Sequence, residues 1–127
     1  MPSIEEYQNS FIEYLESSLP NKSPENLYKP AKYILKLGGK RIRPILTLIS
    51  SEVFEGEFKD ALPAALAIEV FHNFSLVHDD IMDEAPLRRG QETVHKKWNT
   101  NTAILSGDAM LIWSYELLQK YSPDISY

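Results

Sequence analysis

The stretch from Leu62 to about Asp83 is apolar on nearly every side when it is drawn as a helix. A helix on the surface of a soluble protein has one apolar face, whereas a helix that is apolar all round is surrounded by other helices. Glu69, His72 and Asn73 interrupt the apolar run, so it is a poor candidate for a membrane span. The stretch therefore predicts the central helix of a helical bundle.

Amphipathic segments on both sides of this stretch predict the helices that surround it. Apolar residues recur in them at helical spacing, and no segment alternates with the period of two that indicates a strand. We therefore predict an all-α protein, an antiparallel helical bundle. The first helix is expected to begin with a capping box at Ser3 and Glu6 and to end before Pro20-Asn21. The second has a cap at Ser23-Pro24 and ends at Gly38-Gly39, and at Pro30 it either kinks or truly begins. The remaining helices are expected from Pro44 to Gly56, from a cap at Asp60 with Pro63 in the first turn, over Thr93–Trp98, and from Ala103, capped within Asn99–Thr102, to about Lys120.

Composition narrows the class of protein. The 127 residues are enough for one domain, and 43% apolar and 24% charged residues are ordinary values for a soluble globular protein. The formal charge of -5 argues against a nucleic-acid partner. There is no cysteine, which excludes disulfides and thiolate metal sites, and the first residues lack the features of a signal peptide. We expect a cytoplasmic protein with no membrane span.

Three carboxylates, Asp79, Asp80 and Asp83, gather where the central helix ends. Asp79 and Asp83 share one face of a helix and lie about 6 Å apart along its axis. Carboxylates this close repel each other, and a divalent cation between them reverses that effect. Mg²⁺ fits because it prefers oxygen ligands and combines one or two carboxylates with substrate phosphates. The sequence predicts a magnesium site at Asp79 and Asp83, with a solvated acidic helix end as the alternative.

Two basic clusters are candidates for phosphate binding. Lys40, Arg41 and Arg43 lie beside the start of a predicted helix, where free backbone N–H groups also favour an anion. Arg88 and Arg89 follow the aspartates in a predicted loop. Guanidinium forks match phosphate oxygens and lysine supplies a point charge. Either cluster alone also fits a solvated loop, but with the carboxylates they predict two phosphorylated ligands, one of them bound through metal.

Four other residues bear on the site, and two of them, His72 and Phe74, have two interpretations each. His72 lies two turns before Asp79 on the same face, so it is either a core histidine or part of the site. Phe74 lies five residues before Asp79 and is either a core aromatic or the lining of a cavity below the metal. His78 points away from the carboxylates and is interpreted as structural. Gly107 lies inside the last predicted helix and indicates close helix packing.

The order and spacing of these motifs resemble those of the all-trans polyprenyl diphosphate synthases. The matching residues are Gly38-Gly39-Lys40-Arg41-Ile42-Arg43-Pro44, Asp79-Asp80-Ile81-Met82-Asp83, Arg88-Arg89-Gly90 and Leu105-Ser106-Gly107-Asp108. The resemblance implies an isoprenoid synthase fold and a prenyltransferase that condenses isopentenyl diphosphate with an allylic prenyl diphosphate, head to tail and in trans. It also implies Mg²⁺ as cofactor and a homodimer.

The resemblance implies a role for each matching residue as well. Asp79 and Asp83 are similar to the ligands of the Mg²⁺ that bridges to the allylic diphosphate, and Asp80 is similar to the residue that supports them. Arg88 is similar to the residue that helps to hold this diphosphate. The residues similar to those that bind isopentenyl diphosphate are Lys40, Arg43, His72 and Arg89. Phe74 and Ser75 match positions that limit product length, which implies geranylgeranyl or farnesyl diphosphate as product.

One departure from the family pattern affects the expected activity. Family members are longer and carry a second aspartate-rich motif, and no second Asp-Asp-x-x-Asp follows Asp83 in this chain. We expect residues 1–127 to form N-terminal helices of a longer synthase and to be inactive alone. The alternatives are a helical metal phosphohydrolase built on His78-Asp79, and a non-catalytic helical subunit or interaction module.

Overall fold

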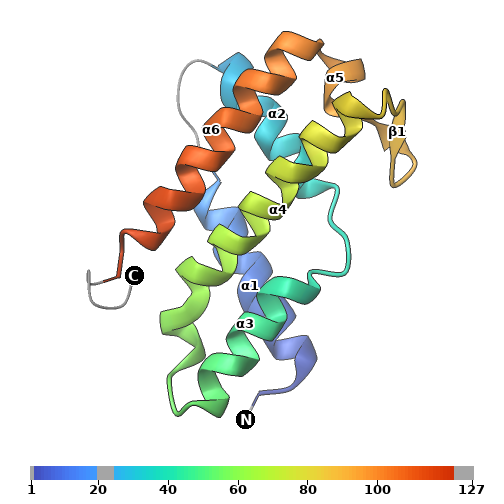
Figure 1. Ribbon diagram of the computed structural model, residues 1–127. Helices are drawn as coiled ribbons and strands as arrows, with labels where there is room; N and C mark the ends of the chain where they lie inside the picture. Colours follow the sequence, from blue (N-terminus) through green and yellow to red (C-terminus); the bar gives the residue numbers. More distant parts are fainter. Residues whose placement is uncertain (1, 20–24, 122–127) are drawn as a thin grey trace. The chain divides into compact units, whose positions relative to one another are not determined.

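The structure, a computed structural model, describes residues 2–19 and 25–121, and these are mostly helical (Figure 1). The chain forms two compact units, which we call the first unit (residues 1–19, 40–69 and 113–127) and the second unit (residues 20–39 and 70–112). Helices α4 (Leu62–Met82) and α6 (Thr100–Leu118) contribute residues to both. The predicted all-α class is confirmed. Within the described ranges, every helix is too short or too polar to cross a bilayer.

In the first unit, α1 (Ile4–Ser18) packs against α3 (Ile42–Val53). The Glu6 N–H donates to Ser3 Oγ at 3.2 Å, which confirms the predicted capping box. Tyr7 is buried, with its ring edge-on to Phe58 at 5.5 Å between centroids and its hydroxyl donating to Glu52 at 3.2 Å. The apolar stripe of α1 therefore anchors this helix in the core of the first unit.

Helix α3 begins two residues earlier than predicted. Pro44 was expected at the first helical position, but α3 begins at Ile42, with Arg41 as N-cap at φ 55°. Any position of the first turn tolerates proline, because those N–H groups have no acceptor inside the helix. At the other end the left-handed residue is Glu55 (φ 66°), and the Gly56 N–H donates to the Ser51 carbonyl at 2.8 Å.

The start of α4 is closed by a tyrosine rather than by the predicted cap. Asp60 lies in a short 3-10 helix, η1 (Phe58–Ala61), and its carbonyl accepts from the Tyr121 hydroxyl at 2.8 Å. The same hydroxyl accepts from the Ala64 N–H at 2.9 Å. Pro63 lies in the first turn of α4, as predicted. A cavity of about 390 Å³ beside this helix start is lined by residues that include Ser51, Gly56, Ala61 and Leu118.

In the second unit, α2 (Glu25–Lys36) packs against the short helix α5 (Val94–Lys97). Helix α2 runs through Pro30, so the helix does not begin there, and the predicted cap at Ser23-Pro24 lies outside the described residues. Gly38 (φ 79°) follows its end in the left-handed conformation, as predicted. Helix α5 confirms the short helix that was expected over Thr93–Trp98.

Helix α6 begins at Thr100, three residues before the predicted start. Asn99 caps it, because the Thr102 N–H donates to Asn99 Oδ1 at 2.7 Å. A Cβ on Gly107 would lie 3.2 Å from the His78 ring, so α6 approaches α4 closely there and the predicted close packing is confirmed.

Residues 84–91 were expected to form a loop, and the absence of strands was predicted for the whole chain. Instead, β1 (Leu87–Arg88) and β2 (Gln91–Glu92) pair antiparallel after the end of α4 (Figure 1). Arg89 (φ 50°) and Gly90 (φ 77°) form the two-residue turn, and two positive φ angles are typical of a type I′ turn. Strands of two residues are too short to show alternation, which is why the pattern did not reveal them.

Candidate functional site

The predicted metal ligands lie at the end of α4. The Asp83 N–H donates to the Asp79 carbonyl at 2.9 Å, so the helical turn continues to Asp83 although α4 itself ends at Met82. Asp79 and Asp83 therefore keep their common face, and both are exposed. Glu84 (φ 53°) then turns the chain, and the Ala85 N–H donates back to the helix. The sequence-based expectation that this carboxylate pair ends the helix on one face agrees with the structure.

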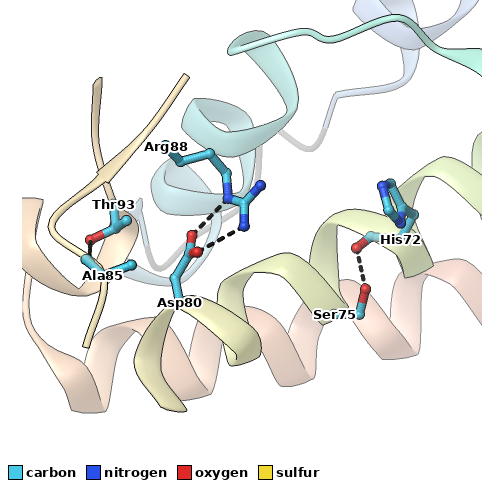
Figure 2. A network of polar contacts seen from close by, with 6 residues as sticks. All are labelled: His72, Ser75, Asp80, Ala85, Arg88 and Thr93. Atoms are coloured by element: carbon cyan, nitrogen blue, oxygen red, sulfur yellow. Dashed lines mark hydrogen bonds and ion pairs between the residues drawn. The ribbon is translucent and has the colours of Figure 1, made fainter. Parts of the chain in front are cut away.

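The carboxylate between them has a different environment. Asp80 is buried, and Arg88 from β1 donates to both of its oxygens, from Nε and Nη2, at 2.8 Å each (Figure 2). These hydrogen bonds raise the pKa of Arg88, against the lowering effect of burial, and the charges of Asp80 and Asp79 raise it further. Arg88 is thus a permanent cation that is already oriented by Asp80. The two were predicted for separate tasks, and sequence spacing alone does not indicate their pairing.

A buried threonine closes the base of the hairpin. Thr93 Oγ1 donates to the Ala85 carbonyl at 2.7 Å (Figure 2). The Thr93 N–H donates to the Pro86 carbonyl at 3.1 Å. The residue is fully buried. It joins the chain entering β1 to the chain leaving β2, and so fixes the segment from which Arg88 reaches Asp80. The sequence pattern indicates only that a short helix begins at Thr93.

Arg89 lies against Gly39, which follows the end of α2. A Cβ on Gly39 would lie 2.7 Å from Arg89 Nη2, so the guanidinium occupies the space that a side chain would need. Gly39 also has φ 124°, a conformation that side chains disfavour. The second unit therefore brings an exposed Arg89 to the glycine that directly precedes Lys40 in the chain.

The three basic residues near the start of α3, in the first unit, differ in their surroundings. Arg41 Nη1 lies 3.1 Å from Glu69 Oε2, and the two side chains are only 10% and 6% exposed. Lys40 and Arg43 are exposed, Lys40 before α3 and Arg43 in its first turn. Arg41, a phosphate-binding candidate in the sequence, therefore forms an internal ion pair that holds the helix start from which its neighbours project.

The residues that were predicted to contact isopentenyl diphosphate are divided between the two units. Of the four residues expected to bind isopentenyl diphosphate, Lys40 and Arg43 belong to the first unit, and His72 and Arg89 to the second. His72 is half-buried, and its carbonyl accepts from Ser75 Oγ at 2.6 Å (Figure 2). The Ser75 hydroxyl is therefore engaged by its own helix.

Phe74 lies where α4 meets α6. Its ring centroid is 5.7 Å from that of Phe71 and 4.5 Å from that of His78, and Gly107 faces both Phe74 and His78. These contacts agree with a packing role for His78. Phe74 is half-buried between the two helices, so its size affects the space there.

Within the described part of the chain, no group of three or more His, Cys, Asp or Glu side chains is arranged to hold a metal. Asp79 and Asp83 nevertheless fit Mg²⁺, because this ion needs only one or two carboxylates when waters and substrate phosphates complete its shell. The pair can thus supply two carboxylate ligands to a divalent cation, and Arg88, which Asp80 orients, lies on the segment that follows.

Comparisons with known proteins identify similar chains. A family model described as Polyprenyl synthetase matches residues 24–126. The geranylgeranyl pyrophosphate synthase of Geoglobus acetivorans is 49% identical over 106 residues, which are 84% of this chain and 33% of the relative. The geranylgeranyl diphosphate synthase of Methanosarcina mazei is 43% identical over 106 residues, with the same coverage of 84% and 33%. The chain thus spans about a third of the length of these relatives.

Solved structures similar to this chain agree with the family model and the sequence relatives. A crystal structure of a geranylgeranyl pyrophosphate synthase is 55% identical, with a TM-score of 0.97 over 100% of this chain and 39% of that one. The geranylgeranyl pyrophosphate synthetase from Pyrococcus horikoshii Ot3 is 40% identical, with a TM-score of 0.88 over 97% of this chain and 38% of that one.

Proposed function

Because the chain belongs to the polyprenyl synthetase family, we propose that residues 1–127 form the N-terminal helices of a synthase domain that condenses isopentenyl diphosphate with an allylic prenyl diphosphate. The product would be a short prenyl diphosphate, geranylgeranyl or farnesyl diphosphate. The observation that carries the proposal is the exposed pair Asp79 and Asp83 on one helix face, next to the Asp80–Arg88 ion pair. Carboxylates at a helix C-terminus meet an adverse dipole as well as each other, and a divalent cation offsets both effects.

In this proposal Asp79 and Asp83 hold Mg²⁺, which supplies positive charge to the leaving diphosphate of the allylic substrate. Arg88 adds a second positive charge at a fixed position, because both oxygens of Asp80 orient its guanidinium. Two of its five N–H donors are used in that pair, and the others can serve a phosphate. Preorganised cations of this kind stabilise charge that develops as the bond to diphosphate breaks.

Lys40, Arg43, His72 and Arg89 would bind isopentenyl diphosphate without metal. The exposure of Lys40, Arg43 and Arg89 supports this assignment, and so does the position of Arg43 in the first turn of α3, where backbone N–H groups attract anions. The allylic C–O bond would break first, and the diphosphate would leave with the bonding electron pair. The isopentenyl double bond would then attack the allylic carbocation, a C–C bond would form, and a proton would leave. Apolar side chains along α4 would exclude water from the cation.

Phe74 and Ser75 would limit the growth of the prenyl tail. The position of Phe74 between α4 and α6 supports this role, because a bulky ring there reduces the space below the acidic end of α4. Ser75 is small, and its hydroxyl donates to the His72 carbonyl of its own helix. Phe74 therefore has the larger side chain of the two and fills more of this space.

We also propose a homodimer that works in the cytoplasm. Leu105 and Ile112 lie two turns apart on α6 and are 58% and 59% exposed, which supports burial of this face by a second subunit. Light scattering after size-exclusion chromatography of the full-length protein should give twice the mass of one chain. A monomer would contradict the proposal.

The central test is a condensation assay on the full-length protein that carries this chain. With Mg²⁺, isopentenyl diphosphate and an allylic diphosphate, we expect pyrophosphate release together with a longer prenyl diphosphate. The 127-residue chain alone should give no steady turnover. Turnover by the 127-residue chain would overturn the expectation that it is inactive alone, and no condensation by the full-length protein would overturn the proposed function.

A further inference from the structure

The hairpin that carries Arg88 and Arg89 is held by an aromatic side chain of α2. The Tyr33 hydroxyl donates to the Glu92 carbonyl at 2.7 Å, in the second of the two short strands. The Tyr33 ring lies edge-on to that of Trp98, 5.4 Å between centroids, and Lys97 Nζ lies 5.0 Å from the centroid of Tyr33. Tyr33 therefore contacts both the hairpin and the residues that follow it.

A hairpin of two residue pairs has little stability of its own, so its place is imposed by its neighbours. One tether joins β1 to α4 through Arg88 and Asp80, and Thr93 closes the base. Tyr33 supplies the tether from α2 to β2. Without it, the turn that contains Arg89 would be held from the α4 side and not from the α2 side.

The segment that follows α2 supplies the surface against which Arg89 lies. The helix ends at Lys36, and Gly39 follows it and contacts the Arg89 guanidinium. Tyr33 thus joins α2, which Gly39 follows in the chain, to the hairpin that carries Arg89. Burial and the charge of Glu92 raise the pKa of Tyr33, so its hydroxyl remains a donor at neutral pH.

We propose that Tyr33 is a positioning residue that places Arg89 for binding of a substrate diphosphate. The inference rests on the proposed function for the identity of that ligand. It follows from the hydrogen bond to the Glu92 carbonyl and the contact of Arg89 with Gly39. Tyr33 does not itself touch the ligand in this proposal.

The test is Tyr33→Phe in the full-length protein, because this change removes only the hydroxyl. Loss of one hydrogen bond should raise the KM for isopentenyl diphosphate about fivefold, with kcat and the KM of the allylic substrate changed less than about twofold. Hydrogen exchange in the peptide that covers residues 87–93 should become faster. Placing 4-aminophenylalanine at position 33, which restores a donor, should recover both values.

Two variants serve as controls. Tyr14→Phe removes another tyrosine hydroxyl, one that accepts from Lys120 at 3.3 Å in the first unit, and should leave KM and exchange unchanged. Glu92→Gln keeps the backbone carbonyl that accepts from Tyr33, so it should also behave like the wild type.

Unchanged KM for isopentenyl diphosphate, or unchanged exchange in the hairpin, in Tyr33→Phe would overturn the proposal. An equal loss in all kinetic constants would do so too, because it indicates a general structural defect. If the wild type does not condense prenyl diphosphates, the proposed function fails, but titration with inorganic pyrophosphate still tests the positioning. About fivefold weaker binding of pyrophosphate by Tyr33→Phe would support it, and equal binding would refute it.

Discussion

Replacing Asp80 by asparagine tests whether the middle aspartate serves Arg88 rather than a metal. The change removes the negative charge of Asp80, whose two oxygens accept hydrogen bonds from Arg88 at 2.8 Å each. Asparagine retains one acceptor oxygen. Breaking a buried ion pair costs about 3–5 kcal/mol. The Arg88 side chain is 23% exposed, so water replaces part of the lost interaction, and we expect a loss of about 2 kcal/mol in the free energy of unfolding.

The assay is urea unfolding of the full-length protein, followed by circular dichroism, for Asp80→Asn, Arg88→Gln and the double variant. The double-mutant cycle should give a coupling of at least about 1 kcal/mol, because each single change removes the same contact. Asp108→Asn, an exposed aspartate of α6 in the same unit, is the matched control and should lie within about 0.5 kcal/mol of the wild type.

The reasoning would be refuted if Asp80→Asn behaved like Asp108→Asn, or if the coupling fell below about 0.5 kcal/mol. Activity adds an independent comparison. Asp80→Asn should keep measurable turnover, because Asp79 and Asp83 remain to hold Mg²⁺, whereas Asp79→Ala should lower kcat by about 100-fold or more.

Three further predictions concern metal, product length and pH. Asp83→Asn should stabilise the metal-free protein by about 0.5 kcal/mol, because it removes a negative charge near the C-terminus of α4. The same change should abolish the rise in melting temperature that Mg²⁺ with pyrophosphate causes. A retained rise would argue against Asp83 as a ligand. Phe74→Ala should lengthen the main product, measured by chromatography of the dephosphorylated prenyl alcohols. The control Ile12→Ala alters an exposed residue of α1 in the first unit and should leave the product unchanged. An unchanged product in Phe74→Ala would remove Phe74 from this role. Burial, and then the charge of Glu52, raise the pKa of Tyr7 above 10.0. The unfolded chain therefore ionises first, so stability from Tyr7 is complete below about pH 10 and is lost as pH rises through the higher folded pKa. Tyr7→Phe should flatten this alkaline loss in denaturation curves between pH 9 and 11, roughly the range around the ordinary tyrosine pKa; an identical pH dependence would contradict the assignment.

The helices could be predicted from the sequence because their apolar residues recur along segments long enough to show a period. Ser3 and Asn99 are local caps whose partners lie three residues away, so short-range pattern is sufficient to find them. The start of α3 could not be located, because Pro44 is compatible with any position in the first turn. Errors at the helix ends therefore come from local rules that permit several registers.

The contacts that organise the site depend on longer range. Asp80 and Arg88 are eight residues apart and meet because the chain turns at Glu84, after the end of α4. Arg41 and Glu69 lie 28 positions apart, and nothing in the basic loop distinguishes Arg41 from its neighbours. Composition and spacing predict which charges belong to the site, but the pairing of those charges requires the fold.

The end of α4 is an unfavourable place for carboxylates, and this bears on why a cation is expected there. The last carbonyls of a helix carry partial negative charge, so Asp79, Asp80 and Asp83 meet an adverse dipole as well as one another. Arg88 neutralises Asp80 and, through its charge, partly offsets Asp79. One guanidinium against three carboxylates still leaves an excess of negative charge on an exposed face. A divalent cation removes this excess, but two carboxylates alone should bind it only with a dissociation constant on the order of millimolar. Tight binding should therefore require the phosphates of a substrate. If the proposed function holds, we expect metal and allylic diphosphate to bind together rather than in sequence.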